Sequence, residues 1–183
     1  MKRREFIQQV TAGGAMLLVP ARLSAQQFLR PGNQVALKCL GTANGPRYLD
    51  GRTANGSVGL VKALTREFSG TKWHVTGGGG KNIALECRGN VPGPRWLDGR
   101  THNGTVGLAP GTALPYSGTR WEIVPMDAGN PNIVALKCLG KIEGPRFLDG
   151  RTQDGTVALA KSTDPPFTGT KWQVEMYPGR FDE

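Results

Sequence analysis

Short runs of alternating apolar and polar residues recur along the chain and predict β-strands. Val35, Leu37 and Cys39 alternate with small or polar neighbours, as expected for a strand with one buried face. The runs that follow in the same stretch are residues 47–52, 57–61 and 72–75. No convincing helical period is found beyond the first residues of the chain. The pattern therefore predicts an all-β protein.

This group of four predicted strands occurs three times. Its clearest marker is the segment Gly-Pro-Arg-aromatic-Leu-Asp-Gly-Arg-Thr, which begins at Gly45, Gly93 and Gly144. In each copy a tryptophan follows the cysteine of the first strand by 34 positions, without a gap. An Asn-Gly or Asp-Gly pair separates the second and third strands and is typical of a tight β-hairpin. We therefore predict three repeats of about 48 residues each, spanning residues 33–80, 81–130 and 131–177.

Three similar units favour a structure that closes on itself. A solenoid needs atypical end repeats, whereas the end repeats here match the middle one, and a propeller usually has at least four blades. The chain beyond Asn33 resembles the β-trefoil superfamily. Its pattern of Tyr48-Leu49, Gly56, Val58 and Trp73 is most similar to fascin-type trefoils. The corner at residues 71–73 is similar to the Gln-x-Trp corner of ricin-type lectins but lacks the glutamine.

The resemblance implies a single β-trefoil domain over residues 26–183. Threefold repetition then predicts its core. The predicted core residues are Val35, Leu37, Cys39, Leu49, Val58, Leu60, Trp73 and Val75, with their counterparts in the other repeats. Burial of an aliphatic side chain contributes about 1.5–3 kcal/mol, so about two dozen such positions can hold one compact domain.

The first residues have the layout of an export signal. A basic head precedes a short apolar run from Val10 to Val19, and the small residue Ala25 follows. The run is too short to span a bilayer as a helix. Residues 3–7, Arg-Arg-Glu-Phe-Ile, resemble a bacterial twin-arginine signal, although the flanking positions depart from its usual residues. We expect cleavage after Ala25. The resemblance implies export in the folded state, to a periplasmic or secreted location.

An ordinary secretory signal or a retained anchor is the alternative for residues 1–25. With the signal removed, no stable membrane span is expected. The chain carries a formal charge of +9, and loss of four cations and one carboxylate with the signal leaves +6. This charge favours acidic partners such as acidic glycans. Nucleic acid is not expected as a partner, because no aromatic-basic ribonucleoprotein motif is present.

The cysteines and histidines do not form a recognisable reactive set. Cys39, Cys87 and Cys138 occupy one repeat position, and an odd set of equivalent residues does not suggest disulfides. They are either buried small hydrophobes or a three-thiolate metal site. Zinc would want a fourth ligand, and His74 and His102 are not repeated, so no metal or cofactor is predicted.

An enzyme is not expected either. No nucleophile, base and orienting acid can be assembled from repeated residues. Each repeat has a single aspartate on its second strand, whereas glycoside hydrolysis needs two carboxylates about 5–9 Å apart.

The second strand of each repeat carries the candidate binding residues. Because strand side chains alternate, Tyr48, Asp50 and Arg52 point outward together if Leu49 points inward. A ring can stack on a sugar face, and a carboxylate and a guanidinium can bind hydroxyls or an acidic group. Flanking loops add an aromatic residue at one repeat position: Phe68, Tyr116 and Phe167. The candidate ligand-binding residues are Tyr48, Asp50, Arg52, Trp96, Asp98, Arg100, Phe147, Asp149 and Arg151.

These residues leave two functions open. The first is a carbohydrate-binding, lectin-like module with up to three related sites, in which Trp96 and His102 favour the second. The first strand lacks the sugar-binding aspartate of ricin-type lectins, which argues against galactose specificity. The second is a protein-interaction module, such as a protease inhibitor or an envelope scaffold. It would use one of the variable stretches 61–67, 109–115 and 160–166. In a purely structural interpretation, Asp50 and Arg52 pair with each other and hold the hairpin.

Overall fold

The structure is a computed structural model that describes residues 25–77 and 82–178. Each repeat has four strands and a short 3-10 helix. The first contains β1 (Gln34–Cys39), β2 (Tyr48–Arg52), β3 (Ser57–Val61), η1 (Arg66–Thr71) and β4 (Trp73–Thr76), preceded by the helix α1 (Ala25–Phe28). The second contains β5 (Asn82–Cys87), β6 (Trp96–Arg100), β7 (Thr105–Ala109), η2 (Ser117–Thr119) and β8 (Trp121–Pro125). The third contains β9 (Ile133–Cys138), β10 (Phe147–Arg151), β11 (Thr156–Ala160), η3 (Thr168–Thr170) and β12 (Trp172–Met176).

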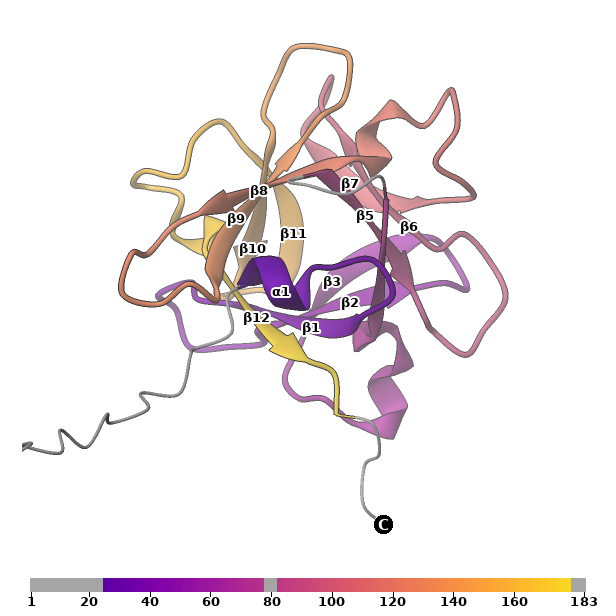
Figure 1. Cartoon of the computed structure of the whole chain (residues 1–183), viewed down its shortest axis with the longest axis horizontal. Coiled ribbons are helices and arrows are strands. Elements are labelled where there is room, and N and C mark those ends of the chain that lie inside the picture. The colour runs from indigo at the N-terminus through magenta and orange to yellow at the C-terminus, as the bar shows by residue number, and fades with distance from the viewer. Residues whose placement is uncertain (1–24, 78–81, 179–183) are drawn as a thin grey trace, which may run out of the picture.

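Six of these strands close a barrel, arranged around a pseudo-threefold axis (Figure 1). They pair in the order β1, β4, β5, β8, β9, β12 and back to β1. The last strand of each repeat pairs with the first strand of the next, and the register is the same at each junction. The pairs are Trp73 with Cys87, Trp121 with Cys138 and Trp172 with Cys39. The repeats therefore interlock in a ring.

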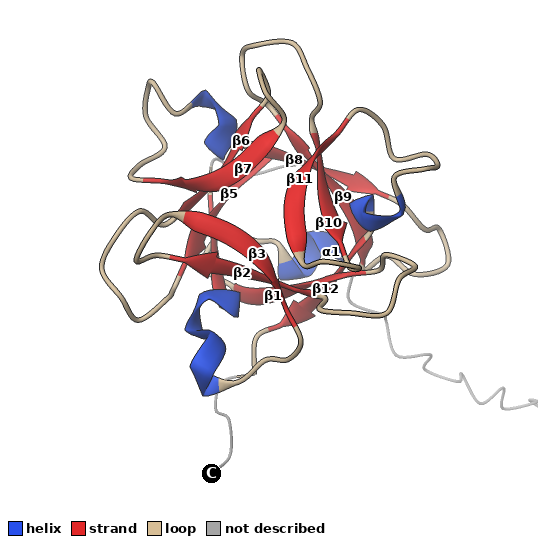
Figure 2. Ribbon diagram, turned by 180° about the vertical axis from the view of Figure 1, so that it is seen from behind, coloured by secondary structure: helices blue, strands red, loops and turns tan. Residues whose placement is uncertain are grey.

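The other six strands form three hairpins, β2–β3, β6–β7 and β10–β11 (Figure 2). Each turn contains a glycine at positive φ, at 72°, 76° and 77° for Gly56, Gly104 and Gly155, as the Asn-Gly and Asp-Gly pairs predict. These glycines also join the hairpins, because their carbonyls accept hydrogen bonds from the amides of Leu108, Leu159 and Leu60, respectively. The predicted β-trefoil is confirmed.

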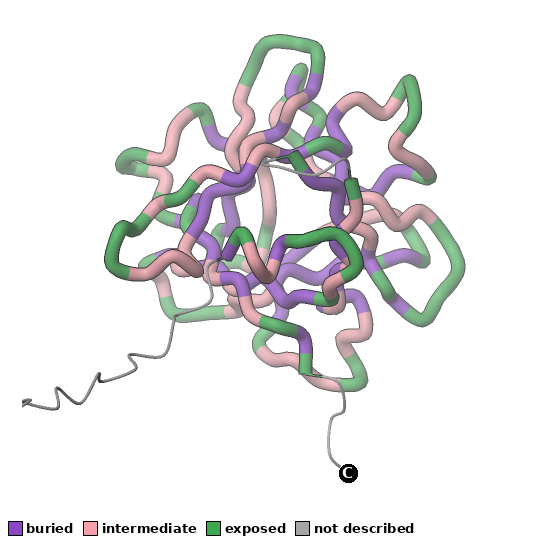
Figure 3. The backbone as a smooth tube through the Cα atoms, in the orientation of Figure 1, coloured by how far each residue is buried: buried purple, intermediate pink, exposed green. Residues whose placement is uncertain are grey.

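The core lies inside the barrel and under the hairpins (Figure 3). Trp73, Trp121 and Trp172 have no exposed surface. Their indole Nε1 atoms donate to the carbonyls of Leu49, Leu97 and Leu148 at 2.9–3.0 Å, so the last strand of each repeat is tied to the hairpin of that repeat. The predicted core is confirmed, with one difference. Val58, Val106 and Val157 pack against the core but stay partly exposed.

Helix α1 contributes to the core from the N-terminal side. Ala25 and Leu29 are buried, and the amide of Ala25 donates to the carbonyl of Pro131 at 2.8 Å. Ala25 is the last residue of the predicted signal. The remainder, residues 1–24, lies outside the described residues. In the described ranges, no helix has the length and apolar character needed to cross a membrane.

The three cysteines are buried thiols that link neighbouring repeats. Each Sγ atom donates to a glycine carbonyl of the preceding repeat at 3.2–3.3 Å. The bonds join Cys39 to Gly150, Cys87 to Gly51 and Cys138 to Gly99. Burial raises the pKa of Cys39 and Cys87 to about 11, so these thiols stay protonated near neutral pH. Among the described residues, no group of three or more His, Cys, Asp or Glu is placed to hold a metal.

Candidate functional site

The second strand of each repeat alternates as its sequence predicts. Leu49 is buried, and a Cβ on Gly51 would lie 2.8 Å from Cys87 Sγ, so both residues face the core. Tyr48, Asp50 and Arg52 therefore lie on the opposite face of β2. The same arrangement holds on β6 and β10, where Gly99 and Gly150 occupy the position of Gly51.

The aspartates on this face are nevertheless buried. Asp50, Asp98 and Asp149 are only 5%, 7% and 8% exposed. The 3-10 helix folds over each of them. A Cβ on Gly70 of η1 would lie 2.7 Å from Asp50 Oδ1 and 2.1 Å from the carbonyl oxygen of Gly51. Gly118 and Gly169 approach Asp98 and Asp149 equally closely. Only glycine fits at these positions. The 3-10 helix, rather than the alternation of the strand, therefore limits the part of each carboxylate that a ligand can reach.

Burial shifts the titration of all three aspartates. It raises the pKa of Asp50, Asp98 and Asp149, and the nearby arginine opposes this effect in each repeat. A hydrogen bond from the Gly169 backbone also lowers the pKa of Asp149. Each carboxylate is thus a desolvated acceptor, which gains when a donor reaches it.

The aspartate–arginine contact differs between repeats. Arg52 Nε lies 3.8 Å from Asp50 Oδ2, and Arg100 Nε lies 3.7 Å from Asp98 Oδ2. The ion pairs within 4.0 Å in the described ranges do not include Asp149 with Arg151.

One methyl group on the third strand distinguishes the third repeat from the first two beside this contact. In the first two repeats the arginine lies over a glycine of the third strand. A Cβ there would be 3.4 Å from Arg52 Nη2 at Gly59 and 3.2 Å from Arg100 Nη2 at Gly107. In the third repeat this position is Ala158, which carries a Cβ where the first two repeats have none. We infer that this methyl group keeps Arg151 farther from Asp149 than the arginines of the first two repeats lie from their aspartates.

The aromatic residues of the second strands lie apart from the aspartates. Tyr48 pairs with Lys38 of β1, whose Nζ is 5.8 Å from the ring centroid. Burial, followed by the charge of Glu175, raises the pKa of Tyr48. Trp96 and Phe147 pair with Glu86 and Lys137 in the same register. All three rings are half-buried beside the first strand of their repeat.

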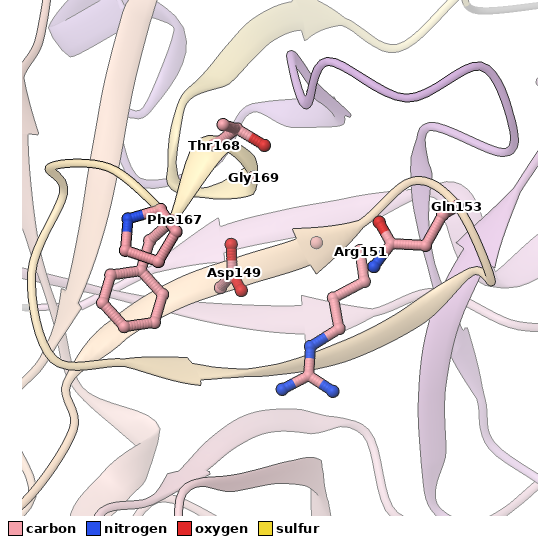
Figure 4. Close-up of a pocket in the computed structure, with 8 residues that line it drawn as sticks. Asp149, Arg151, Gln153, Phe167, Thr168 and Gly169 are labelled. Carbon is pink, nitrogen blue, oxygen red and sulfur yellow. The ribbon is translucent and has the colours of Figure 1, made fainter.

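A hollow of about 180 Å³ opens beside Asp149 (Figure 4). Asp149 lies between the ring of Phe167 and the side chain of Arg151, and Gln153 and Thr168 complete the rim. Figure 4 shows that the rim residues come from two segments, the β10–β11 hairpin and the loop that ends in η3. The hollow thus combines a carboxylate, a cation, a ring and polar groups.

The second repeat has an equivalent hollow of about 240 Å³. It is lined by Asp98, Arg100, His102, Tyr116 and Ser117, and by Ile142 from the third repeat. A third, larger hollow of about 570 Å³ lies between the hairpins of these two repeats. Arg151 and Phe167 line both this space and the Asp149 hollow, so the two hollows adjoin.

The structure therefore regroups the residues predicted for the site. Asp98 with Arg100 and Asp149 with Arg151 come together, whereas Trp96 and Phe147 do not line these hollows. Their place is taken by the loop aromatics Tyr116 and Phe167, which the repeat pattern marks beside the site. The covering glycines and Ile142 carry no comparable signal in the sequence.

Comparison with known proteins supports the fold. No protein-family model matches the chain, and no curated protein matches it in sequence. Solved structures do match. The β-trefoil named BEL superposes with a TM-score of 0.61 and 17% identity, covering 85% of this chain and 100% of that one. A GlcNAcα1-4Gal-releasing endo-β-galactosidase from Clostridium perfringens superposes with a TM-score of 0.59 and 14% identity over 80% of this chain. This chain spans 33% of that enzyme.

Proposed function

We propose that this protein is a non-catalytic carbohydrate-binding module that uses the hollows beside Asp98 and Asp149. The observation that carries the proposal is the setting of each aspartate. A buried carboxylate, an arginine and an aromatic ring border one small hollow in two successive repeats. Sugars offer hydroxyl donors for a carboxylate and a C–H face for a ring.

The chemistry of the hollows favours binding over catalysis. A single carboxylate lines each of them, which matches the need to bind hydroxyls but not the two-carboxylate machinery of most glycosidases. The similarity in fold to part of an endo-β-galactosidase also supports a role in carbohydrate binding. Two weak sites on one rigid domain would gain avidity on a polymer.

Glycan-array binding followed by NMR titration tests this proposal. A bound oligosaccharide is expected to shift the amides of Gly150 and Gly169, which line the Asp149 hollow, and those of Gly99 and Gly118, which line the Asp98 hollow. Asp98→Asn/Asp149→Asn should abolish these shifts while the protein stays folded. Absence of binding to any glycan at millimolar concentration would refute the proposal.

We further propose export through a twin-arginine signal to the periplasm or the outside of the cell, supported by residues 3–7 and the apolar run after them. Arg3→Lys/Arg4→Lys tests this in cells. Accumulation of uncleaved protein in the cytoplasm supports the route, and unchanged export of the variant contradicts it.

One observation favours the alternative, a protein-interaction module. Leu114 is 72% exposed in the stretch 109–115, and Ile142 nearby is 57% exposed. Exposed apolar side chains of this size are typical of contact sites. Inhibition of a protease panel that is lost in Leu114→Ser but retained in Asp98→Asn would support this function.

A further inference from the structure

A different pocket, of about 210 Å³, lies where the first repeat meets the second and the C-terminal segment. Its walls include Arg66, Ser69 and Lys72 from the first repeat, Arg88 and Asn90 from the second, and Tyr177 after β12. It shares no lining residue with the hollows beside Asp98 and Asp149.

One backbone hydrogen bond of this pocket recurs at all three repeat junctions, and a second bond recurs at two of them. The amide of Arg88 donates to the carbonyl of Lys72 at 2.8 Å, and that of Asn90 donates to Ser69 Oγ at 3.1 Å. At the next junction, Leu139 bonds to the carbonyl of Arg120 at 2.8 Å, and Lys141 bonds to Ser117 Oγ at 3.3 Å. The scaffold is therefore repeated, and only the side chains on it differ.

Three cations meet on this scaffold at one junction. The counterparts of Arg66, Lys72 and Arg88 at the second junction are Leu114, Arg120 and Leu139. At the third junction they are Pro165, Lys171 and Leu40. Each of these junctions keeps one basic residue of the three. Leucine or proline stands at the equivalent positions of the other two junctions. The fold therefore does not require arginine at positions 66 and 88.

The cations are positioned by local contacts. Lys72 Nζ lies 5.0 Å from the ring centroid of Tyr177, which is itself 9% exposed. Glu86 lies 3.1 Å from Arg88 Nη1 and also 3.3 Å from His74 Nδ1. Glu86 thus orients Arg88 and neutralises part of its charge. Ser69 Oγ accepts a hydrogen bond from Asn90, so its own proton remains a donor.

We propose that this pocket binds one tetrahedral oxyanion, a sulfate or phosphate group. Guanidinium and ammonium groups placed around a small volume, with a hydroxyl donor, match the several oxygens of such an anion. The anion is either free or carried as an ester on a saccharide. The site is independent of the carbohydrate proposal.

An NMR titration at constant ionic strength tests the site, with sodium sulfate, galactose 6-sulfate and galactose as separate ligands. Sulfate should shift the amides of Ser69 and Asn90, and Arg66→Leu/Arg88→Leu should raise its Kd at least about tenfold. These leucines stand at the equivalent positions of the second junction, so the fold should tolerate them. Tighter binding of galactose 6-sulfate than of sulfate would identify an ester, and equal binding a free anion.

Two control variants separate this site from general charge and from the hollows. Lys161→Ala removes a cation elsewhere on the surface, and Asp149→Asn changes the hollow in the third repeat; neither should alter sulfate binding. Transfer of the site by Leu114→Arg/Leu139→Arg should produce sulfate-dependent shifts at Ser117 and Lys141. Equal affinity in the parent and Arg66→Leu/Arg88→Leu, or equal weakening by Lys161→Ala, would overturn the proposal.

Discussion

The hollows of the second and third repeats have the same frame but hold their carboxylates differently. In the second, Arg100 lies 3.7 Å from Asp98, over Gly107. In the third, Ala158 replaces that glycine, and the ion pairs within 4.0 Å among the described residues do not include Asp149 with Arg151. We infer that one methyl group on a neighbouring strand determines how closely the arginine approaches the carboxylate.

The comparison changes which site should bind more tightly. The sequence favours the second repeat because of Trp96 and His102. His102 does line the Asp98 hollow, but Trp96 lies beside Glu86 and does not. The ring in each hollow is Tyr116 or Phe167, and these offer similar stacking surfaces. The ion pair at Asp98, which has no counterpart at Asp149 among the described residues, then favours tighter ligand binding in the third repeat.

The largest expected effect is a loss of stability when the glycine that covers Asp149 is substituted. In Gly169→Ala the new Cβ would lie 2.0 Å from the Gly150 carbonyl oxygen and 2.7 Å from Asp149 Oδ1. The strand and the covering turn must separate, so we expect a loss of about 1–3 kcal/mol in the free energy of unfolding. Urea unfolding measures it. Gly111→Ala is the control, because nothing lies within 4 Å of its Cβ, and it should change stability by less than about 0.5 kcal/mol. Equal stability of the two variants would show that the turn does not press on Asp149.

The next effect concerns binding alone. Asp149→Asn keeps the shape of the side chain but removes its charge. Loss of one charge-assisted hydrogen bond, about 1.5–3 kcal/mol, should weaken oligosaccharide binding about 10- to 100-fold. Asp98→Asn should cost less, because Arg100 already neutralises part of that carboxylate. Calorimetric titration of both variants with one oligosaccharide gives the ranking, and a larger loss in Asp98→Asn would reverse it.

A smaller effect is expected when the methyl groups are exchanged. Gly107→Ala should move Arg100 away from Asp98 and strengthen binding at that hollow, and Ala158→Gly should allow Arg151 to approach Asp149 and weaken binding there. Half-exposed ion pairs contribute up to about 1 kcal/mol, so each change should alter the Kd about two- to fivefold. NMR shifts at Gly118 and Gly169 report the two hollows separately. Unchanged affinity in both variants would show that the arginine contact has no influence on binding.

The fold could be predicted from the sequence because its information is local and repeated. Alternation identified the strands, the Asn-Gly and Asp-Gly pairs identified the hairpins, and three copies pointed to closure. The short 3-10 helices gave no periodic signal, since three residues such as Ser117–Thr119 are too few to show one.

The site was predicted only in part, because its decisive contacts join distant segments. Alternation placed Asp149 and Arg151 on one face of β10. It could not show that Gly169 covers the aspartate, that the arginine of the first two repeats lies over a glycine, or that Ile142 reaches the neighbouring hollow. These contacts follow from the packing of the turn and of the next repeat, which no pattern within one strand reports.

The smallest expected effect is a pH dependence that separates the carboxylate from its surroundings. Because burial raises the pKa of Asp149, the folded protein holds this proton more tightly than the unfolded chain does. The contribution of Asp149 to stability is therefore greatest below the ordinary aspartate pKa, and it decreases as the pH rises through the higher pKa of the folded state. Asn resembles the protonated acid, so Asp149→Asn should melt like the parent at low pH and slightly higher than the parent at neutral pH. Melting curves of both proteins between pH 3 and pH 7 measure the difference. A variant that loses stability relative to the parent as the pH rises would mean that the ionised Asp149 supports the fold, and the third hollow would then be part of the scaffold.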